Sequence, residues 1–226
     1  MFTLNPLPPQ IDPALLALLL EAEPATIGHI RHHGFMAPEI RLQLPGYRRV
    51  AGTAVTVRSY AADTSIVHYA LGKLRPGDFL VVDRSGDTRH ALCGGGVGFS
   101  AKTAGCVGIV LDGPATDVQE LRDHDMPVWS RGLSTVTGKP LFEFGEFCTT
   151  VSCGGVSVAP GDAILADENG VLVLKPWEIA AAASVAVAMQ MEEKAVLARV
   201  AAGEKLSDIN GATARIEALA AAARPR

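Results

Sequence analysis

The sequence predicts an α/β protein whose core is a largely parallel sheet. Between residues 49 and 132, apolar runs alternate with segments of helical spacing, and the connections between them are short. This alternation is typical of βαβ units, in which each helix carries the chain back to start the next parallel strand. The second half has turn residues every eight or so positions, which indicates strands joined by hairpins.

The elements of the first half follow in order along the chain. Residues 13–33 predict one or two helices closed by Gly34, and Pro38, Pro45 and Gly46 then mark an irregular stretch. Residues 49–60 alternate small and β-branched side chains as a strand does, and residues 64–74 have one broad apolar helical face. The elements expected next are strands in 75–83, 106–113 and 126–132, and helices in 98–105 and 116–125.

A repeated turn marks the second half. "RPGDFLVVD" (75–83) resembles "APGDAILAD" (159–167), and each is interpreted as a Pro-Gly-Asp turn that leads into a buried strand. We therefore interpret Asp78 and Asp162 as turn residues rather than catalytic ones. Pro176 suits the first turn of a helix, and the Ala-rich segment 177–202 predicts a long helix that lies against its own sheet or a neighbouring subunit.

Composition excludes several classes of protein. The chain has 226 residues, of which 48% are hydrophobic, so one domain with a sizeable core is expected over residues 1–226, with the main core at about 25–205. The net charge of −4, with dispersed cations, argues against a nucleic-acid partner. The apolar run 179–191 is too short to span a membrane, and the N-terminus lacks a basic signal region, so we expect a cytoplasmic protein. The four cysteines lack metal or redox spacing, which predicts buried thiols.

A glycine-rich run, "CGGGVGFSAKTAG" (93–105), lies between two predicted strands. It is not a P-loop, because Ala101 stands where that motif requires glycine before Lys102, and its match to a dinucleotide-binding loop is weak. A glycine turn that enters a helix exposes backbone N–H groups at the positive end of the helix dipole, which suits a carboxylate or phosphate. The alternative is that these glycines only allow close packing of a strand against a helix.

Two carboxylates follow the next predicted strand. Asp112 and Asp117 flank a Gly-Pro turn at the carboxyl end of that strand, where open α/β sheets place ligand groups. They could hold a hard divalent ion such as Mg²⁺, which takes one or two protein carboxylates and completes its shell with water and substrate. For Asp117, capping of the following helix is an equally good interpretation.

At these residues the chain resembles the RraA-like family, which includes class II 4-hydroxy-4-methyl-2-oxoglutarate aldolases and the regulator of ribonuclease activity. The resemblance runs through "GFMAPEIRLQLPGYRRVAGTAVTV", "ADTSIVHYALGKLRPGDFLVVD", "AKTAGCVGIVLDGPATDVQEL", "MPVWSRG" and "VAPGDAILADENGVLVLKP". It implies a three-layer α/β/β sandwich of the swivelling β/β/α type, with a long C-terminal helix. It also implies a homotrimer or a dimer of trimers with active sites between subunits.

The resemblance assigns roles to individual residues. It implies that Asp117 binds a divalent metal, Mg²⁺ or Mn²⁺, and that an acid from a neighbouring subunit falls near Glu192 or Glu193. This sequence departs from the family at two places: Thr116 stands where an arginine is expected, and Gly95 where an acid is expected. Threonine has neither the charge nor the two-pronged geometry with which arginine binds a carboxylate.

Two functions remain open from the sequence. The first is a metal-dependent lyase that acts on a small 2-oxo acid, of the aldolase or oxaloacetate decarboxylase type, with Lys102 or Arg84 replacing the missing arginine. The second is a non-catalytic, protein-binding regulator, which the two departures favour. The residues expected to bind substrate are Gly94, Gly95, Gly96, Val97, Gly98 and Thr116, and those expected to act in catalysis are Asp117 and Lys102.

Overall fold

The computed structural model describes residues 1–44, 46 and 49–223, so the predicted break at Pro45 lies outside the described residues. Nine of the described strands form one sheet, in which β10 pairs with both β11 and β3 beside the main order β1-β7-β3-β4-β5-β6-β2. These strands are β1 (Phe2–Leu4), β2 (Arg41–Leu42), β3 (Val50–Arg58), β4 (Asp78–Asp83), β5 (Gly108–Leu111), β6 (Val128–Ser130), β7 (Gly145–Phe147), β10 (Ala163–Asp167) and β11 (Gly170–Leu174). A separate hairpin pairs β8 (Val151–Cys153) with β9 (Val156–Val158).

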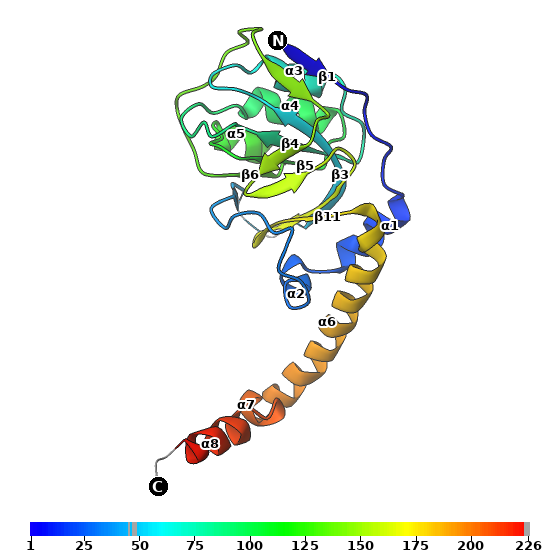
Figure 1. Cartoon of the computed structure of the whole chain (residues 1–226), viewed down its shortest axis with the longest axis vertical. Helices are drawn as coiled ribbons and strands as arrows, with labels where there is room; N and C mark the ends of the chain where they lie inside the picture. Colours follow the sequence, from blue (N-terminus) through cyan, green and yellow to red (C-terminus); the bar gives the residue numbers. More distant parts are fainter. Residues whose placement is uncertain (45, 47–48, 224–226) are drawn as a thin grey trace.

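The centre of the sheet is parallel. β3, β4, β5 and β6 lie side by side in one direction, and the chain returns between them through helices (Figure 1). These helices are α3 (Ser65–Leu71), α4 (Gly95–Thr103) and α5 (Val118–Asp123). The carboxyl ends of all four strands therefore meet at one edge, which the loops leading into the helices surround.

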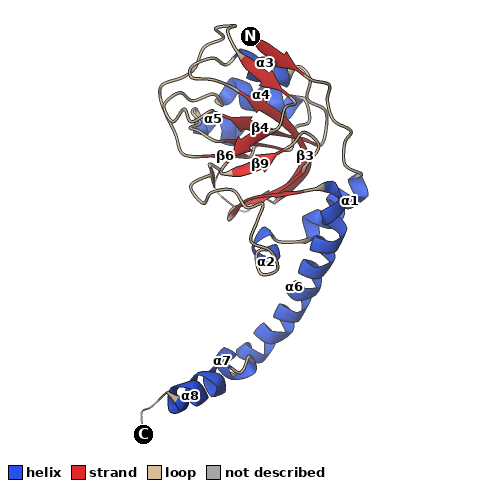
Figure 2. Ribbon diagram, in the orientation of Figure 1, coloured by secondary structure: helices blue, strands red, loops and turns tan. Residues whose placement is uncertain are grey.

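The fold has three layers (Figure 2). Alternate residues of the strands point to opposite faces, so Leu80 and Ile109 pack beneath α3, α4 and α5, whereas Phe79 and Val110 pack beneath the β8–β9 hairpin. Trp129 is fully buried in this second core, and its indole Nε1 donates to the carbonyl of Asp167 at 2.7 Å. Helices, main sheet and hairpin thus form the predicted α/β/β sandwich, and the fold class is confirmed.

A third core joins the terminal helices to β10 and β11. It is formed with α1 (Pro13–Glu21), α2 (Pro24–Ile27) and the first turns of α6 (Ile179–Ala201), which follows a 3₁₀ turn over Pro176–Glu178. The last buried residue of α6 is Ala186, and the helix then leaves the body as an arm that also carries α7 (Leu206–Ile209) and α8 (Ala212–Ala222) (Figure 1). The predicted long C-terminal helix is confirmed. None of the described helices combines the length and apolarity that a membrane crossing needs.

Local chemistry explains where the predicted elements are right and where they are wrong. The predicted 13–33 stretch forms two helices, the second starting at Pro24, but the second ends at Ile27, so Gly34 does not close it. Gly34 has a φ of +86° and its carbonyl accepts from the amide of Val173 on β11. The predicted turn role of Asp78 and Asp162 is confirmed, because each carboxylate accepts at 2.8 Å from an amide three residues earlier.

Candidate active site

The main candidate site is a cavity of about 480 Å³ beside the amino end of α4. This volume lies within the range of roughly 300–1,000 Å³ that is usual for small-molecule sites. Its walls come from α3, from the start of α4, from Thr116 and Asp117 before α5, and from the segment 137–140. The lining residues are Thr64, His68, Leu71, Ala91, Leu92, Gly94, Gly96, Val97, Ser100, Thr116, Asp117, Thr137, Gly138 and Pro140.

The glycine run begins α4 rather than preceding it. Helix α4 starts at Gly95, three residues before the predicted helix, and Gly94 is its N-cap in an extended conformation. Gly96 and Val97 line the cavity, and as first-turn amides their N–H groups have no acceptor within the helix. The amide of Gly98 instead donates to the carbonyl of Gly94 at 2.9 Å, so it is not available to a ligand.

Asp117 lies at the junction between the cavity and α5. Its backbone has a φ of 49° and a ψ of 43°, a left-handed conformation that is uncommon outside glycine, and its side chain makes no capping bond to α5. The carboxylate turns to α4 instead, where Oδ2 accepts from the amide of Gly95 at 3.3 Å. Oδ1 accepts from the hydroxyl of Thr116 at 3.2 Å. Asp117 is therefore an exposed carboxylate held at the positive end of a helix rather than a cap.

Two carboxylates fill the space beside the glycines. A Cβ atom at Gly94 would lie 2.3 Å from Oδ2 of Asp117, and one at Gly95 would lie 1.7 Å from Oε2 of Glu120. Position 95, where the family resemblance expects an acid, thus has a carboxylate from α5 in the space that its own side chain would enter. Gly98 packs on the same flank, where a Cβ would lie 2.4 Å from Cδ2 of Leu121. Gly95 and Gly98 therefore face α5 and not the cavity.

This packing gives a prediction for stability. Replacing Gly95 with alanine is expected to cost about 1–3 kcal/mol of unfolding free energy, because the new methyl overlaps Glu120, including its Cβ at 2.7 Å. In a Glu120→Ala background the cost should fall by at least about 0.5 kcal/mol, as coupled neighbours show. Urea unfolding of the wild type, the two single variants and the double variant measures this coupling. Gly96→Ala is the matched control: it meets nothing within 4 Å, so alanine there should be neutral or stabilising.

The two predicted replacement cations lie outside the cavity lining. Lys102 is in the last turn of α4, where Nζ donates to the carbonyl of Asp125 at 2.8 Å. Arg84 is fully buried, and its guanidinium donates to Ser59 Oγ and to the carbonyls of Ala61 and His90. Thr116 does line the cavity, as expected. The catalytic role of Lys102 stays a prediction, but its side chain binds at the opposite end of α4 from Asp117.

The wall formed by α3 was not found from the sequence. Thr64 and His68 both line the cavity and lie four residues apart, which places them on one face of α3. Thr64 is 5% exposed, and its Oγ1 has no hydrogen-bond partner among the described residues. The signal was present as two polar residues four positions apart in "TSIVH", at the edge of the apolar face.

Asp63 ties the segment that follows the cavity wall to the start of α3. Its carboxylate accepts from Ser65 Oγ at 2.5 Å and from the backbone amides of Ser65, Leu141, Glu143 and Phe144 at 2.9–3.2 Å. Burial alone would raise the pKa of this carboxyl group, but the hydrogen bonds lower it well below its usual range. The cavity wall at Thr137–Pro140 therefore continues into a segment that a buried ionised carboxylate holds in place.

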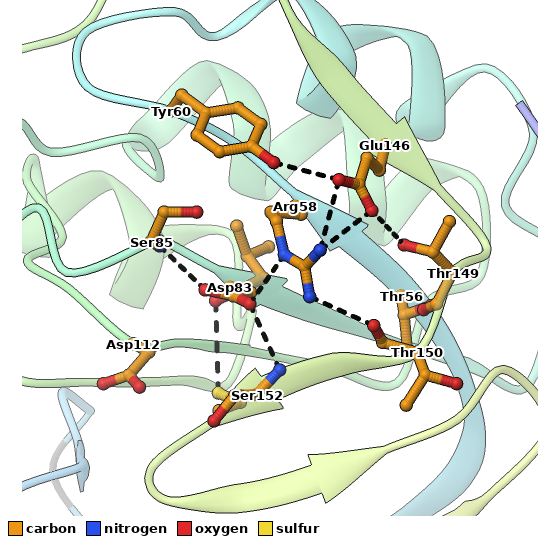
Figure 3. Close-up of polar contacts among 12 residues, drawn as sticks. Thr56, Arg58, Tyr60, Asp83, Ser85, Asp112, Glu146, Thr149, Thr150 and Ser152 are labelled. Atoms are coloured by element: carbon orange, nitrogen blue, oxygen red, sulfur yellow. Dashed lines mark hydrogen bonds and ion pairs between the residues drawn. The ribbon is translucent and has the colours of Figure 1, made fainter. Parts of the chain in front are cut away.

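A second polar cluster lies at the carboxyl ends of β3 and β4, where the antiparallel β7 begins (Figure 3). Arg58 donates to Asp83 at 3.0 Å and to both oxygens of Glu146, and Asp83 also accepts from the amides of Ser85 and Ser152. Burial acts to raise the pKa of Glu146, but bonds from Thr149, Tyr60 and Arg58 lower it. These groups satisfy one another, and none of them lines the cavity.

Asp112 belongs to this paired edge and not to the cavity. Its carboxylate pairs with Arg131 and accepts from the amide of Gly154 at 2.9 Å. Asp112 and Asp117 were predicted as two possible ligands of one ion, but the charge of Asp112 is already neutralised by Arg131. Among the residues that the structure describes, no group of three or more His, Cys, Asp or Glu side chains is arranged to hold a metal ion.

The remaining sequence candidates lie elsewhere. Glu192 and Glu193 are exposed on the arm of α6, so any role in a site depends on a neighbouring subunit. The predicted buried thiols are confirmed, because all four cysteines are buried and unpaired. Burial raises the pKa of Cys93 to about 12 and those of Cys106 and Cys148 to about 11. None of these thiols is set up to act as a nucleophile.

Comparison with known proteins identifies relatives of this chain. Residues 24–173 match the RraA-like family, described as Aldolase/RraA. A 4-hydroxy-4-methyl-2-oxoglutarate aldolase of Thermus thermophilus is 32% identical over 156 residues, which cover 69% of this chain and 93% of that protein. A protein of Halalkalibacterium halodurans is 36% identical over 126 residues, which cover 56% of this chain and 60% of that protein.

Solved structures show the same fold. A protein of Pseudomonas syringae superposes with a TM-score of 0.77 at 22% identity, covering 92% of this chain and 98% of that one. The RNA-processing inhibitor RraA of Thermus thermophilus superposes with a TM-score of 0.61 at 28% identity, covering 68% of this chain and 93% of that one. Because the family match spans more than half of its residues, this chain belongs to the RraA-like family.

Proposed function

We propose that this chain is a divalent-metal-dependent lyase that cleaves a carbon–carbon bond beside the carbonyl of a small 2-oxo acid. The observation that carries the proposal is the position of Asp117. Its carboxylate borders the cavity without an arginine or lysine partner among the described residues, next to the amides of Gly96 and Val97, which have no acceptor within α4. Relatives named as 4-hydroxy-4-methyl-2-oxoglutarate aldolases support the same reaction class.

The residues present suit a hard divalent ion. Mg²⁺ and Mn²⁺ prefer carboxylate oxygens and water, and Mg²⁺ sites commonly use only one or two protein carboxylates. Asp117, which lines the cavity, would hold the ion, and water and substrate would complete its shell. When bound, the ion would act as a Lewis acid on the 2-oxo group.

The chain itself would bind and orient the acid. The amides of Gly96 and Val97 would donate to the substrate carboxylate, with the helix dipole of α4 favouring its negative charge. Leu71, Leu92 and Val97 line the same cavity and would exclude water from the reacting carbons. These two features bring a carboxylate and an adjacent carbonyl to the side of the cavity where Asp117 lies.

The non-catalytic alternative retains one specific observation in its favour. Thr116 borders the cavity at the place where the family resemblance expects an arginine, so the usual charge clamp for a substrate carboxylate is missing. A regulator that binds another protein would not need that clamp. The solved RNA-processing inhibitor of Thermus thermophilus is a structural relative with such a name.

We also propose that the chain assembles as a homotrimer or a dimer of trimers. The arm of α6, α7 and α8 carries exposed apolar side chains, among them Leu197, Leu206, Ile216 and Leu219. Helices with exposed apolar faces are usually stabilised by packing, here against another subunit. In such an assembly the arm would bring Glu192 or Glu193 to a neighbouring cavity. Sedimentation analysis of the full chain tests the assembly.

The reaction itself is tested by metal removal and replacement. After treatment with EDTA and dialysis, the protein should show no cleavage of 4-hydroxy-4-methyl-2-oxoglutarate or decarboxylation of oxaloacetate. Activity should return with Mg²⁺ or Mn²⁺ and stay absent with Ca²⁺ as a less well-matched ion. Pyruvate release, followed by a coupled assay, is the measurement. A protein that binds metal and oxalate in a thermal-shift assay yet never turns over either substrate would support the regulator instead.

A further inference from the structure

The α3 wall of the cavity carries a buried polar atom that the protein leaves unsatisfied. Thr64 is 5% exposed, and its Oγ1 has no hydrogen-bond partner among the described residues. As the N-cap of α3, Thr64 also makes no side-chain bond to the amides of its own helix. A buried hydroxyl without a partner costs free energy, so its position beside a cavity points to a partner that enters the cavity.

His68 lies one turn further along the same face. Its imidazole is exposed on α3, and no described residue forms an ion pair or hydrogen bond with it. Among the residues that line the cavity it is the one side chain able to carry positive charge, since the other titratable group is Asp117. Lys102 and Arg84 are held by other parts of the protein.

The opposing segment is shaped to approach Thr64 closely. A Cβ at Gly138 would lie 2.6 Å from Cγ2 of Thr64, so only glycine at position 138 lets the 137–140 segment pack there. The amide of Thr64 donates to the carbonyl of Lys139 at 2.9 Å, which fixes the same contact through the backbone. The methyl of Thr64 is thus packed against this segment, while its hydroxyl remains without a partner among the described residues.

We propose that His68 and Thr64 bind the acid that enters this cavity, with His68 the cavity side chain that can carry positive charge where Thr116 cannot. His68 donates a charge-assisted hydrogen bond to an oxygen of the ligand, and Thr64 donates a second one from the same face of α3. The proposal rests on the proposed function for the nature of the ligand, a small oxo acid. It adds that charge recognition in this chain comes from α3 and not from the residue before Asp117.

Binding of oxalate, measured by calorimetry with Mn²⁺ present and again without metal, tests the role of His68. His68→Gln should weaken binding by about tenfold or more, because glutamine can donate a hydrogen bond but cannot carry positive charge, whereas His68→Lys should bind within about threefold of the wild-type chain. The matched control is His32→Gln, which removes an exposed histidine that does not line the cavity.

The role of Thr64 is tested by two measurements on its variants, the melting temperature without ligand and the affinity for oxalate. Thr64→Val keeps the shape of the side chain and removes only the hydroxyl, so the melting temperature without ligand should not fall, while oxalate binding should weaken several-fold. Thr64→Ser should bind as the wild-type chain does. A hydroxyl with a purely structural role would give the reverse, a lower melting temperature and unchanged binding.

The outcomes separate this inference from the proposed function. If the wild-type chain binds oxalate but has no lyase activity, the function fails while the binding data still decide the roles of His68 and Thr64. If the chain is an active lyase and both His68→Gln and Thr64→Val bind oxalate like the wild type, this inference is overturned and the function stands. A wild-type chain that binds no oxalate under either condition overturns the inference as well.

Discussion

Asp117→Asn is expected to reduce metal-dependent turnover by about 10²-fold or more while leaving the fold intact. The amide keeps the size of the side chain and can still accept from the Gly95 amide through its oxygen, but it lacks the charge that a hard cation requires. Because the carboxylate is exposed and pairs with no described cation, its replacement leaves no buried charge behind. The melting temperature should therefore change little.

The measurement is steady-state turnover across a series of Mn²⁺ concentrations, together with direct Mn²⁺ binding. The matched control is Asp123→Asn, which removes one exposed carboxylate from the carboxyl end of α5, the helix that follows Asp117. This control should leave both readings unchanged. Wild-type activity in Asp117→Asn at all metal concentrations would contradict the placement of the metal.

Asp63→Asn is expected to destabilise the protein by roughly 2–4 kcal/mol, the largest effect on stability that we predict for a polar residue. The carboxylate accepts from three amides of the 141–144 segment and from two donors of Ser65. An asparagine would turn an NH₂ group towards some of these donors and leave them unsatisfied. The loosened segment continues from the cavity wall at Pro140, so the KM of the lyase reaction should rise as well.

The pH dependence of this effect has a definite sign. The pKa of Asp63 in the folded protein lies below its value in the unfolded chain, which is roughly 3.9 for an aspartic acid. Its stabilisation is therefore fully present above that unfolded value and is lost as the pH falls towards the folded value. Urea titrations between about pH 6 and pH 2 should show a steeper loss of stability for the wild type than for Asp63→Asn. The exposed Asp208→Asn should follow the wild-type curve.

The fold was predictable because its signals are local. Buried strands such as β4 and β5 are short apolar runs bounded by turn residues, and the turns at Asp78 and Asp162 use Pro, Gly and Asp for identifiable backbone reasons. The ends of the helices were predicted less accurately. Gly95 to Gly98 have low helix propensity, yet they form the first turn of α4, because Glu120 and Leu121 of α5 fill the space that side chains at 95 and 98 would need.

The site was only partly predictable, since it depends on contacts between distant segments. The sequence identified Asp117, Thr116 and the start of α4, which lie together on one side of the cavity. It did not identify Glu120, whose place beside Gly95 depends on how α5 packs on α4. Lys102 and Arg84 were also predicted as cations of the site, because a sequence shows which residues are charged but not where their side chains point. His68 could not be identified either, since its place in the cavity depends on how α3 packs beside α4.

Because all four thiols are buried, the rate at which they react with an external reagent reports how often the core opens. A thiol-specific alkylating reagent reacts with thiolate, and burial raises the pKa of each cysteine in the native state. Labelling at neutral pH should therefore proceed through transient opening of the core rather than through the native surface. Cys93 precedes the glycines that begin α4, so mass-resolved labelling would compare local loosening at the cavity, reported by Cys93, with unfolding of the core under the hairpin, reported by Cys153 of β8.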